Sequence, residues 1–151
     1  MARSRQAGFT MIELLVVVFI GAVLMSIALP QFGAVQARRA AANARDAYIW
    51  LANRGRANAI ERGEQILVSV DPTSARAVML LPNGDTLELV DFIARYDARV
   101  VTSNGGVFDI CYLPRGYALS TCSDAPGTVS FWVAGDTAAA DVQALGHAEI
   151  P

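Results

Sequence analysis

The stretch that decides the fold runs from Gly8 to Pro30 and reads GFTMIELLVVVFIGAVLMSIALP. From Phe9 to Leu29 every residue is apolar or small, apart from two hydroxyl side chains and one acid, Glu13. As a helix, these 21 residues would be roughly 31 Å long, about the thickness of the hydrocarbon core of a membrane. The stretch therefore predicts a membrane-spanning helix.

The segment before this helix is short and basic, with Arg3 and Arg5 and no acid. An isolated carboxylate such as Glu13 in a membrane span costs on the order of 2.5–3.5 kcal/mol, so it calls for a partner. A basic leader followed by an apolar segment that is kept differs from an ordinary secretory signal, whose apolar region is removed. A plain membrane anchor with a stray acid is the alternative interpretation.

Gly8-Phe9-Thr10, followed by Glu13 and closed by Pro30, resembles the N terminus of type IV pilins and pseudopilins. In that family a prepilin peptidase cuts after the glycine and methylates the new N terminus. The resemblance implies cleavage between Gly8 and Phe9, an N-methylated Phe9, and a Glu13 carboxylate that meets the amine of a neighbouring subunit. Such a pair compensates two charges that are each costly alone in lipid. Phe9, Glu13 and Pro30 are thereby the expected assembly residues.

The expected organisation has four parts: a cleaved leader at 1–8, a transmembrane and assembly helix at 9–30, an amphipathic half of the same helix at 31–63, and a β-rich extracytoplasmic domain at 64–151. The formal net charge is −2, and loss of the two leader arginines takes it to −4. A mildly acidic chain with dispersed arginines lacks the clustered basic residues that nucleic-acid binding requires.

The helix-favouring pattern continues after Pro30, which is expected to bend the helix and to leave one carbonyl without its helical partner. Winding residues 38–62 at 100° each produces one apolar stripe. It contains Ala41, Ala44, Tyr48, Leu51, Ala52, Gly55 and Ala59. This stripe is expected to lie on a sheet. Arg62-Gly63 is expected to end the helix, with a cation in the last turn followed by glycine. Ile49, Trp50 and Ile60 fall outside it, and they pack either on neighbouring subunits or in a wider buried face of the same molecule.

From residue 65 onward, short apolar runs separated by Gly, Pro, Asn and Asp predict strands. The expected strands are 65–70, 76–81, 86–90, 107–113, 117–122, 128–134, 138–145 and 147–150. The segment 92–101 is ambiguous, because Ile93 and Tyr96 could belong to a short helical turn and 99–102 to a further strand. A long helix followed by six to eight such strands indicates an α+β fold, with antiparallel sheet packed on the helix.

Two further segments, Phe108 to Gly116 and Leu145 to Ile150, narrow the resemblance to the H-type minor pseudopilins and the FimT/FimU minor pilins. That family implies two β-sheets packed on the helix. Cys111 and Cys122 lie in the domain that Arg3 and Arg5 would keep outside the cytoplasm, where disulfides persist. A bridge between them would stabilise the fold by about 3 kcal/mol, and two free buried thiols are the alternative.

No motif for catalysis is present. His147 is the single histidine, with only Glu149 as a nearby acid, and is expected on the surface. The two cysteines lack the further ligands that zinc requires. The aspartates sit mostly in turns without the spacing of a calcium-binding EF-hand, and calcium binding by loop carboxylates stays open. The chain is therefore expected to need no cofactor and not to be an enzyme.

The interpretation is a minor pilin or pseudopilin of the inner membrane, single-pass, with its globular domain in the periplasm. It would support either protein secretion, in a type II secretion pseudopilus, or pilus biogenesis, at a type IV pilus tip. Its partners would be other pilin-like subunits, a prepilin peptidase, the inner-membrane assembly platform and lipid. A FimT-like DNA-binding role is the alternative, and nucleic acid is disfavoured because only Arg99 and Arg115 follow Tyr96, against six acids.

Overall fold

The structure is a computed structural model that describes residues 9–151. It divides into an N-terminal unit that ends at Val35 and a compact globular unit from Gln36 to Pro151. The elements are, in chain order, α1 (Met11–Arg62), β1 (Ile66–Asp71), β2 (Arg76–Leu80), β3 (Thr86–Asp91), α2 (Phe92–Tyr96), β4 (Arg99–Thr102), β5 (Phe108–Tyr112), β6 (Gly127–Val133), β7 (Asp136–Val142) and β8 (Ala148–Glu149).

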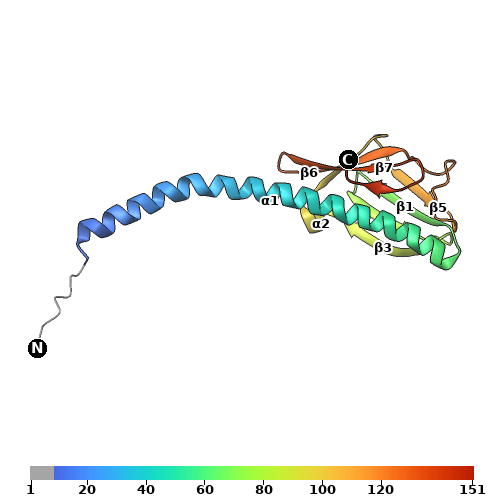
Figure 1. Cartoon of the computed structure of the whole chain (residues 1–151), viewed down its shortest axis with the longest axis horizontal. Helices are drawn as coiled ribbons and strands as arrows, with labels where there is room; N and C mark the ends of the chain where they lie inside the picture. Colours follow the sequence, from blue (N-terminus) through green and yellow to red (C-terminus); the bar gives the residue numbers. More distant parts are fainter. Residues whose placement is uncertain (1–8) are drawn as a thin grey trace, which may run out of the picture. The chain divides into compact units, whose positions relative to one another are not determined.

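Two four-stranded antiparallel sheets form the β part of the globular unit. The first, sheet A, has the strand order β3-β2-β1-β5, and the second, sheet B, has the order β4-β6-β7-β8. Within the globular unit α1 lies along both sheets (Figure 1). The α+β fold and the two sheets on one helix are therefore confirmed.

The face of α1 that packs on the sheets is the predicted one. Its seven stripe residues are all buried, and Ala37 extends the stripe by one turn toward the N terminus. At Gly55 the backbone of α1 lies very close to β1, because a Cβ at this position would lie 2.5 Å from Cγ2 of Val68. α1 ends at Arg62, and Gly63 follows in a left-handed conformation with φ of 67°, as the Arg-Gly pair predicts.

Ile49, Trp50 and Ile60 do not share one environment. Ile49 packs against the core, so the stripe is wider there than predicted. Trp50 is 49% exposed and Ile60 is 53% exposed. Both side chains leave apolar surface in contact with solvent.

Aromatic side chains join α1, α2 and sheet B in the core. The ring of Phe131 on β6 lies 4.8 Å from the ring of Phe92 and 5.9 Å from that of Tyr48, measured between centroids. Phe92 opens α2, and β4 begins at Arg99, so the ambiguous segment 92–101 contains both the helical turn and the strand. α2 begins there because the Asp91 carboxylate accepts a hydrogen bond of 2.9 Å from the Ala94 N–H, a side-chain cap of the helix N terminus.

The prediction of a strand at 117–122 is wrong. This segment forms a single isolated β-bridge, between Tyr112 and Ala118, instead of a strand. Gly116, with φ of 80°, turns the chain back along β5, and turns occupy the following residues. The last two predicted strands are also shorter than expected, because β7 ends at Val142 and β8 comprises two residues.

Candidate processing and assembly segment

The first turn of α1 is fixed by a cap that sequence reasoning missed. The Thr10 hydroxyl oxygen accepts a hydrogen bond of 3.3 Å from the Glu13 N–H, and the Thr10 carbonyl accepts one of 3.2 Å from the Leu14 N–H. Thr10 is thus the N-cap residue and Glu13 occupies the third helical position. The Thr-x-x-Glu spacing was the available signal. The helix therefore begins two residues later than the predicted start at Phe9.

Glu13 is placed where its charge is favourable in an isolated chain. A carboxylate in the first turn interacts with the positive end of the helix dipole. Its side chain is exposed, and among residues 9–151 no basic side chain forms an ion pair with it. Phe9 is 80% exposed beside it. Gly8 and the rest of the leader lie outside the described residues, so the cleavage position stays a prediction.

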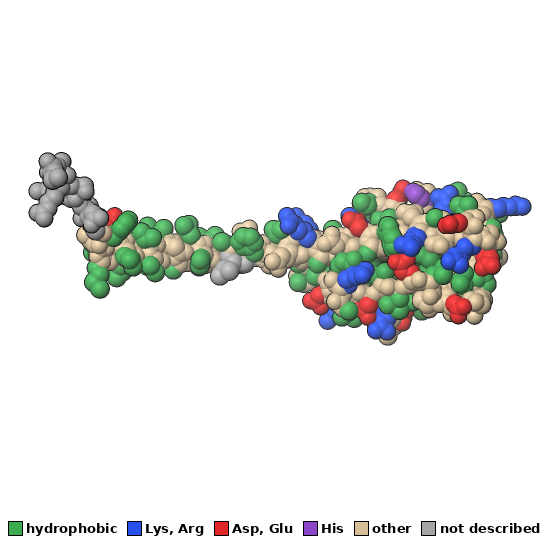
Figure 2. All heavy atoms as spheres, turned by 90° about the horizontal axis from the view of Figure 1, so that it is seen from below, with side chains coloured by type: hydrophobic (Ala, Val, Ile, Leu, Met, Phe, Trp, Pro, Cys, Tyr) green, Lys and Arg blue, Asp and Glu red, His purple; other side chains and the backbone are tan. Residues whose placement is uncertain are grey.

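The N-terminal unit offers an uncovered apolar surface. Each large hydrophobic side chain from Met11 to Ile27 is at least 45% exposed. In Figure 2 hydrophobic side chains dominate this segment, whereas charged side chains gather on the globular unit. Within residues 9–151, α1 is the one helix that is long and apolar enough to cross a membrane, with a mean hydropathy of 2.7 over its most apolar window. Soluble monomers rarely expose such a surface.

α1 continues through Pro30 without interruption. Because proline has no N–H, the Ser26 carbonyl one turn earlier lacks its usual helical donor. The Ser26 hydroxyl is itself satisfied, because it donates to the Val23 carbonyl at 2.7 Å. The predicted bend at Pro30 stays a prediction.

Two comparisons with known proteins bear on the chain, one by sequence motif and one by structure. The model of the prokaryotic N-terminal methylation motif matches residues 3–29. The type IV minor pilin FimU of Pseudomonas aeruginosa PAO1 is similar in structure, with a TM-score of 0.58 at 12% sequence identity, over 76% of this chain and 90% of FimU. The chain has a pilin-like fold.

A second crystal form of FimU gives the same result, with a TM-score of 0.54 at 12% identity over 72% of this chain and 90% of FimU. At this identity the likeness establishes the fold. No curated protein matches the chain by sequence. The motif and the fold together support the resemblance to minor pilins and pseudopilins inferred from the sequence.

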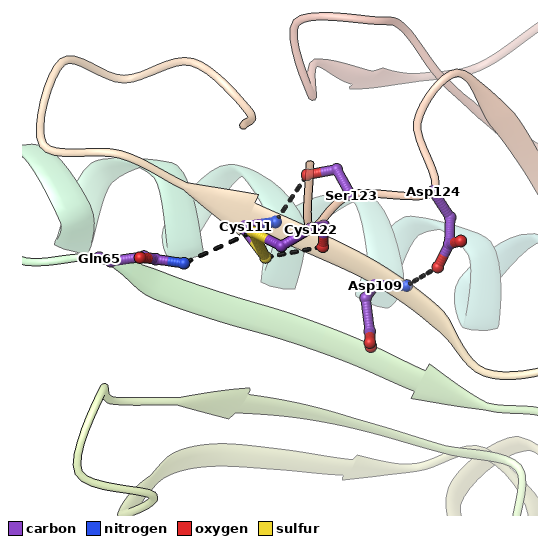
Figure 3. Close-up of a disulfide and its surroundings, with 6 residues drawn as sticks. All are labelled: Gln65, Asp109, Cys111, Cys122, Ser123 and Asp124. Atoms are coloured by element: carbon purple, nitrogen blue, oxygen red, sulfur yellow. Dashed lines mark hydrogen bonds between the residues drawn. A yellow bond between two sulfur atoms is a disulfide. The ribbon is translucent and has the colours of Figure 1, made fainter. Parts of the chain in front are cut away.

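The predicted disulfide is present in the globular unit of this pilin-like chain. Cys111 on β5 is bonded to Cys122, with their Cα atoms 5.9 Å apart, which excludes two free thiols. Figure 3 shows the segment after Cys122 beside β5. The Cys111 N–H donates to the Ser123 hydroxyl at 2.9 Å, and the Asp109 N–H donates to the Asp124 carboxylate at 2.7 Å. Ser123 and Asp124 therefore cover the outer edge of β5.

The perturbed carboxyl groups of the globular unit have structural partners. Hydrogen bonds from the Ser74 hydroxyl and the Thr73 N–H lower the pKa of Asp71. The Ala94 N–H, followed by the Arg76 guanidinium, lowers the pKa of Asp91. Both aspartates thus hold a turn or a helix start.

Two tyrosines are held neutral by the core. Burial raises the pKa of Tyr48 and of Tyr112 well above the ordinary tyrosine value.

His147 is exposed, next to β8. In the part of the chain that the structure describes, no three His, Cys, Asp or Glu side chains converge as metal ligands.

Proposed function

We propose that this chain is a minor pilin or pseudopilin subunit that is cut between Gly8 and Phe9, methylated at the amine of Phe9, and assembled into a filament. The observation that carries the proposal is the presence of two features in one chain: the methylation motif at residues 3–29 and the minor-pilin fold of the globular unit. The chain would contribute packing surfaces to the filament and perform no catalysis itself.

The proposed assembly contact joins the methylated amine of Phe9 to the Glu13 carboxylate of a neighbouring subunit. The exposed carboxylate of Glu13 and the uncovered side chains of Met11 to Ile27 support it. A bundle of such helices would bury this apolar surface and would give the carboxylate a cation in a medium of low dielectric constant. Pro30 would mark the end of the bundled segment.

The proposed location is the inner membrane before assembly, with a cytoplasmic N terminus and a periplasmic globular unit. Arg3 and Arg5 favour this orientation, because basic residues beside a span stay on the cytoplasmic side. The Cys111–Cys122 bridge favours it independently, because disulfides persist outside the cytoplasm. Prepilin peptidase and the assembly platform of the same membrane would be the processing and assembly partners.

Processing is tested by intact mass after co-expression with a prepilin peptidase. The wild-type chain should lose residues 1–8 and gain one methyl group, whereas Gly8→Arg should retain the leader. Gly21→Ala controls for an altered glycine inside the apolar stretch, and Gly33→Arg controls for an added arginine at an exposed position beyond it, with open space for a side chain; both should be processed. An unchanged wild-type mass, or normal cleavage of Gly8→Arg, would refute the assignment.

Assembly is tested by comparing Glu13→Gln with Glu61→Gln, an exposed position in the globular half of α1. Both variants should be processed and inserted. Glu13→Gln should be depleted from sheared filaments, because its neutral side chain cannot compensate the amine of Phe9. Equal incorporation of the two variants would contradict the pairing. Secretion and pilus assembly, measured in the same deletion strain, distinguish the two possible systems.

A further inference from the structure

One edge of sheet A is left open by the residues that the structure describes. The opposite edge, β5, is covered by Ser123 and Asp124. In sheet B, β8 comprises two residues, and Val100 and Thr102 of the edge strand β4 are buried. β3 is the remaining edge strand (Figure 1), and it is six residues long. Leu89 in β3 is 51% exposed, so this edge is accessible to a further strand.

The backbone of β3 alternates between its partner strand and the open side. The Phe92 N–H donates to the Ala75 carbonyl at 2.9 Å, which marks a hydrogen-bonded position of the antiparallel ladder. The register of β2 on β3 then turns the backbone groups of Glu88 and Val90 toward β2 and those of Leu89 toward the open side. Within residues 9–151 no strand pairs with that side. The N–H and C=O of Leu89 are therefore available to an added strand.

The side chains beside this edge carry apolar surface on both faces of sheet A. On the outer face Leu89 lies opposite Val78 of β2, which is partly buried. On the face toward α1, the Glu88 carboxylate lies 3.5 Å from Nε of Arg54. The Arg54 guanidinium in turn lies 4.7 Å from the centroid of the Trp50 ring, and Trp50 is 49% exposed. An added strand would cover apolar surface near both faces of the edge.

The edge is complementary to itself. If two β3 strands pair antiparallel with Leu89 opposite Leu89, the N–H of each leucine can donate to the C=O of the other. The two leucine side chains then face each other, and facing apolar pairs stabilise a sheet. On the other face the two Glu88 residues become diagonal neighbours, within reach of long side chains. Each copy brings Arg54 together with Glu88, so the charges of the two copies balance across the contact.

The size of this contact predicts its strength. A stable interface buries about 1,200–2,000 Å² in total, and the pairing of one short strand with another is smaller than that. The association should therefore be weak and should depend on protein concentration. A two-fold contact uses the same patch on both copies, so it closes at two copies and does not extend into a filament.

We propose that two copies of this chain associate through their β3 edges, antiparallel, with Leu89 of one copy opposite Leu89 of the other. The contact joins the two copies of sheet A into one continuous sheet. It uses residues of the globular unit alone, so it does not rest on the proposed pairing of Phe9 with Glu13. A strand of a different protein is the competing occupant of the same edge.

The first test is sedimentation of the full chain in detergent micelles over a range of protein concentrations. The wild type should show a dimer fraction that rises with concentration. Leu89→Arg places two like charges opposite each other and should weaken dimerisation about tenfold or more. Leu145→Arg adds the same charge at a loop position that is 67% exposed, and it should dimerise as the wild type does. A wild type that stays monomeric would overturn the proposal and leave the edge to a different protein, and equal dimerisation of the two variants would also overturn it.

A charge exchange at the same position tests whether residue 89 faces its own counterpart. Leu89→Glu alone should be as defective as Leu89→Arg, whereas an equal mixture of the two variants should recover dimers, because opposite charges then face each other. Both variants should keep the wild-type urea midpoint, since Leu89 is exposed. Absence of recovery in the mixture would overturn the proposal.

Cross-linking gives a second readout that does not depend on charge. Facing residues at a hydrogen-bonded position have Cα atoms about 5.5 Å apart, which is within the range of a disulfide. Under mild oxidation Leu89→Cys should therefore form covalent dimers, and Leu145→Cys should form few. Equal cross-linking of the two variants would contradict the pairing through β3.

Discussion

Tyr48 and Tyr112 allow the same chemical change, Tyr→Phe, to be made at two fully buried positions with opposite expected results. The Tyr112 hydroxyl donates to the Gly146 carbonyl at 2.5 Å. Among residues 9–151 the Tyr48 hydroxyl has no hydrogen-bond partner. Removing the first hydroxyl deletes a buried hydrogen bond, whereas removing the second deletes a buried polar group that bonds to no described residue.

The expected magnitudes follow from these two environments. Tyr112→Phe leaves the buried Gly146 carbonyl unpaired, so the free energy of unfolding should fall by about 1–3 kcal/mol. Tyr48→Phe removes a desolvated hydroxyl without stranding any acceptor. It should leave the free energy of unfolding unchanged or raise it by up to about 1 kcal/mol. The two variants should therefore differ by roughly 2 kcal/mol or more.

The assay is urea unfolding of the full chain in detergent micelles, followed by the emission of Trp50 and Trp132, which both belong to the globular unit. With a urea dependence of about 1–3 kcal/mol per M, Tyr112→Phe should unfold at a midpoint about 1 M lower than the wild type. Tyr48→Phe should unfold at the wild-type midpoint or above it. A loss for Tyr48→Phe as large as that for Tyr112→Phe would refute the reasoning, because the Tyr48 hydroxyl would then be hydrogen-bonded.

Three further predictions use the same assay. Replacing Cys111 and Cys122 together by serine should lower the free energy of unfolding by about 3 kcal/mol, and a reductant should then have no additional effect on the variant. Gly55→Ala should destabilise the chain by about 1–2 kcal/mol, because the added Cβ would crowd Val68. This cost exceeds the roughly 1 kcal/mol that the higher helix propensity of alanine contributes. A variant that is more stable than the wild type would contradict this prediction. The pKa of Asp91 is lower in the folded chain than in the unfolded chain. The ionised carboxylate therefore stabilises the fold above the unfolded pKa of about 3.9, and this stabilisation is lost as the pH falls through the folded pKa. In Asp91→Asn the free energy of unfolding should accordingly depend less steeply on pH below about 5.

The parts of the fold that follow from local periodicity could be predicted from the sequence. The stripe from Ala41 to Ala59 depends only on the 100° rotation per helical residue, and its stripe residues are buried as predicted. The α1 terminus at Arg62 followed from the adjacent glycine. The pairing of Cys111 with Cys122 could be predicted because the chain has two cysteines, which allow a single intramolecular disulfide.

The parts that depend on alignment between distant segments could not be predicted. Residues 117–122 have the composition of a strand, but they turn along the β5 edge because Leu119, Ser123 and Asp124 bond to it individually. The pairing of Arg99 with Trp132 needed the register of β4 on β6, which the alternation of β6 alone does not fix. The cap at Thr10 was visible as Thr-x-x-Glu, but the apolar pattern favoured a start at Phe9.

The cover over β5 has a consequence for molecules whose cysteines are not yet oxidised. β5 is the last strand of sheet A, and an uncovered terminal strand is a template for pairing with foreign polypeptide. The Cys111–Cys122 bond ties the covering segment to that strand. Oxidation thus keeps the cover on β5 and limits edge-to-edge aggregation of this chain.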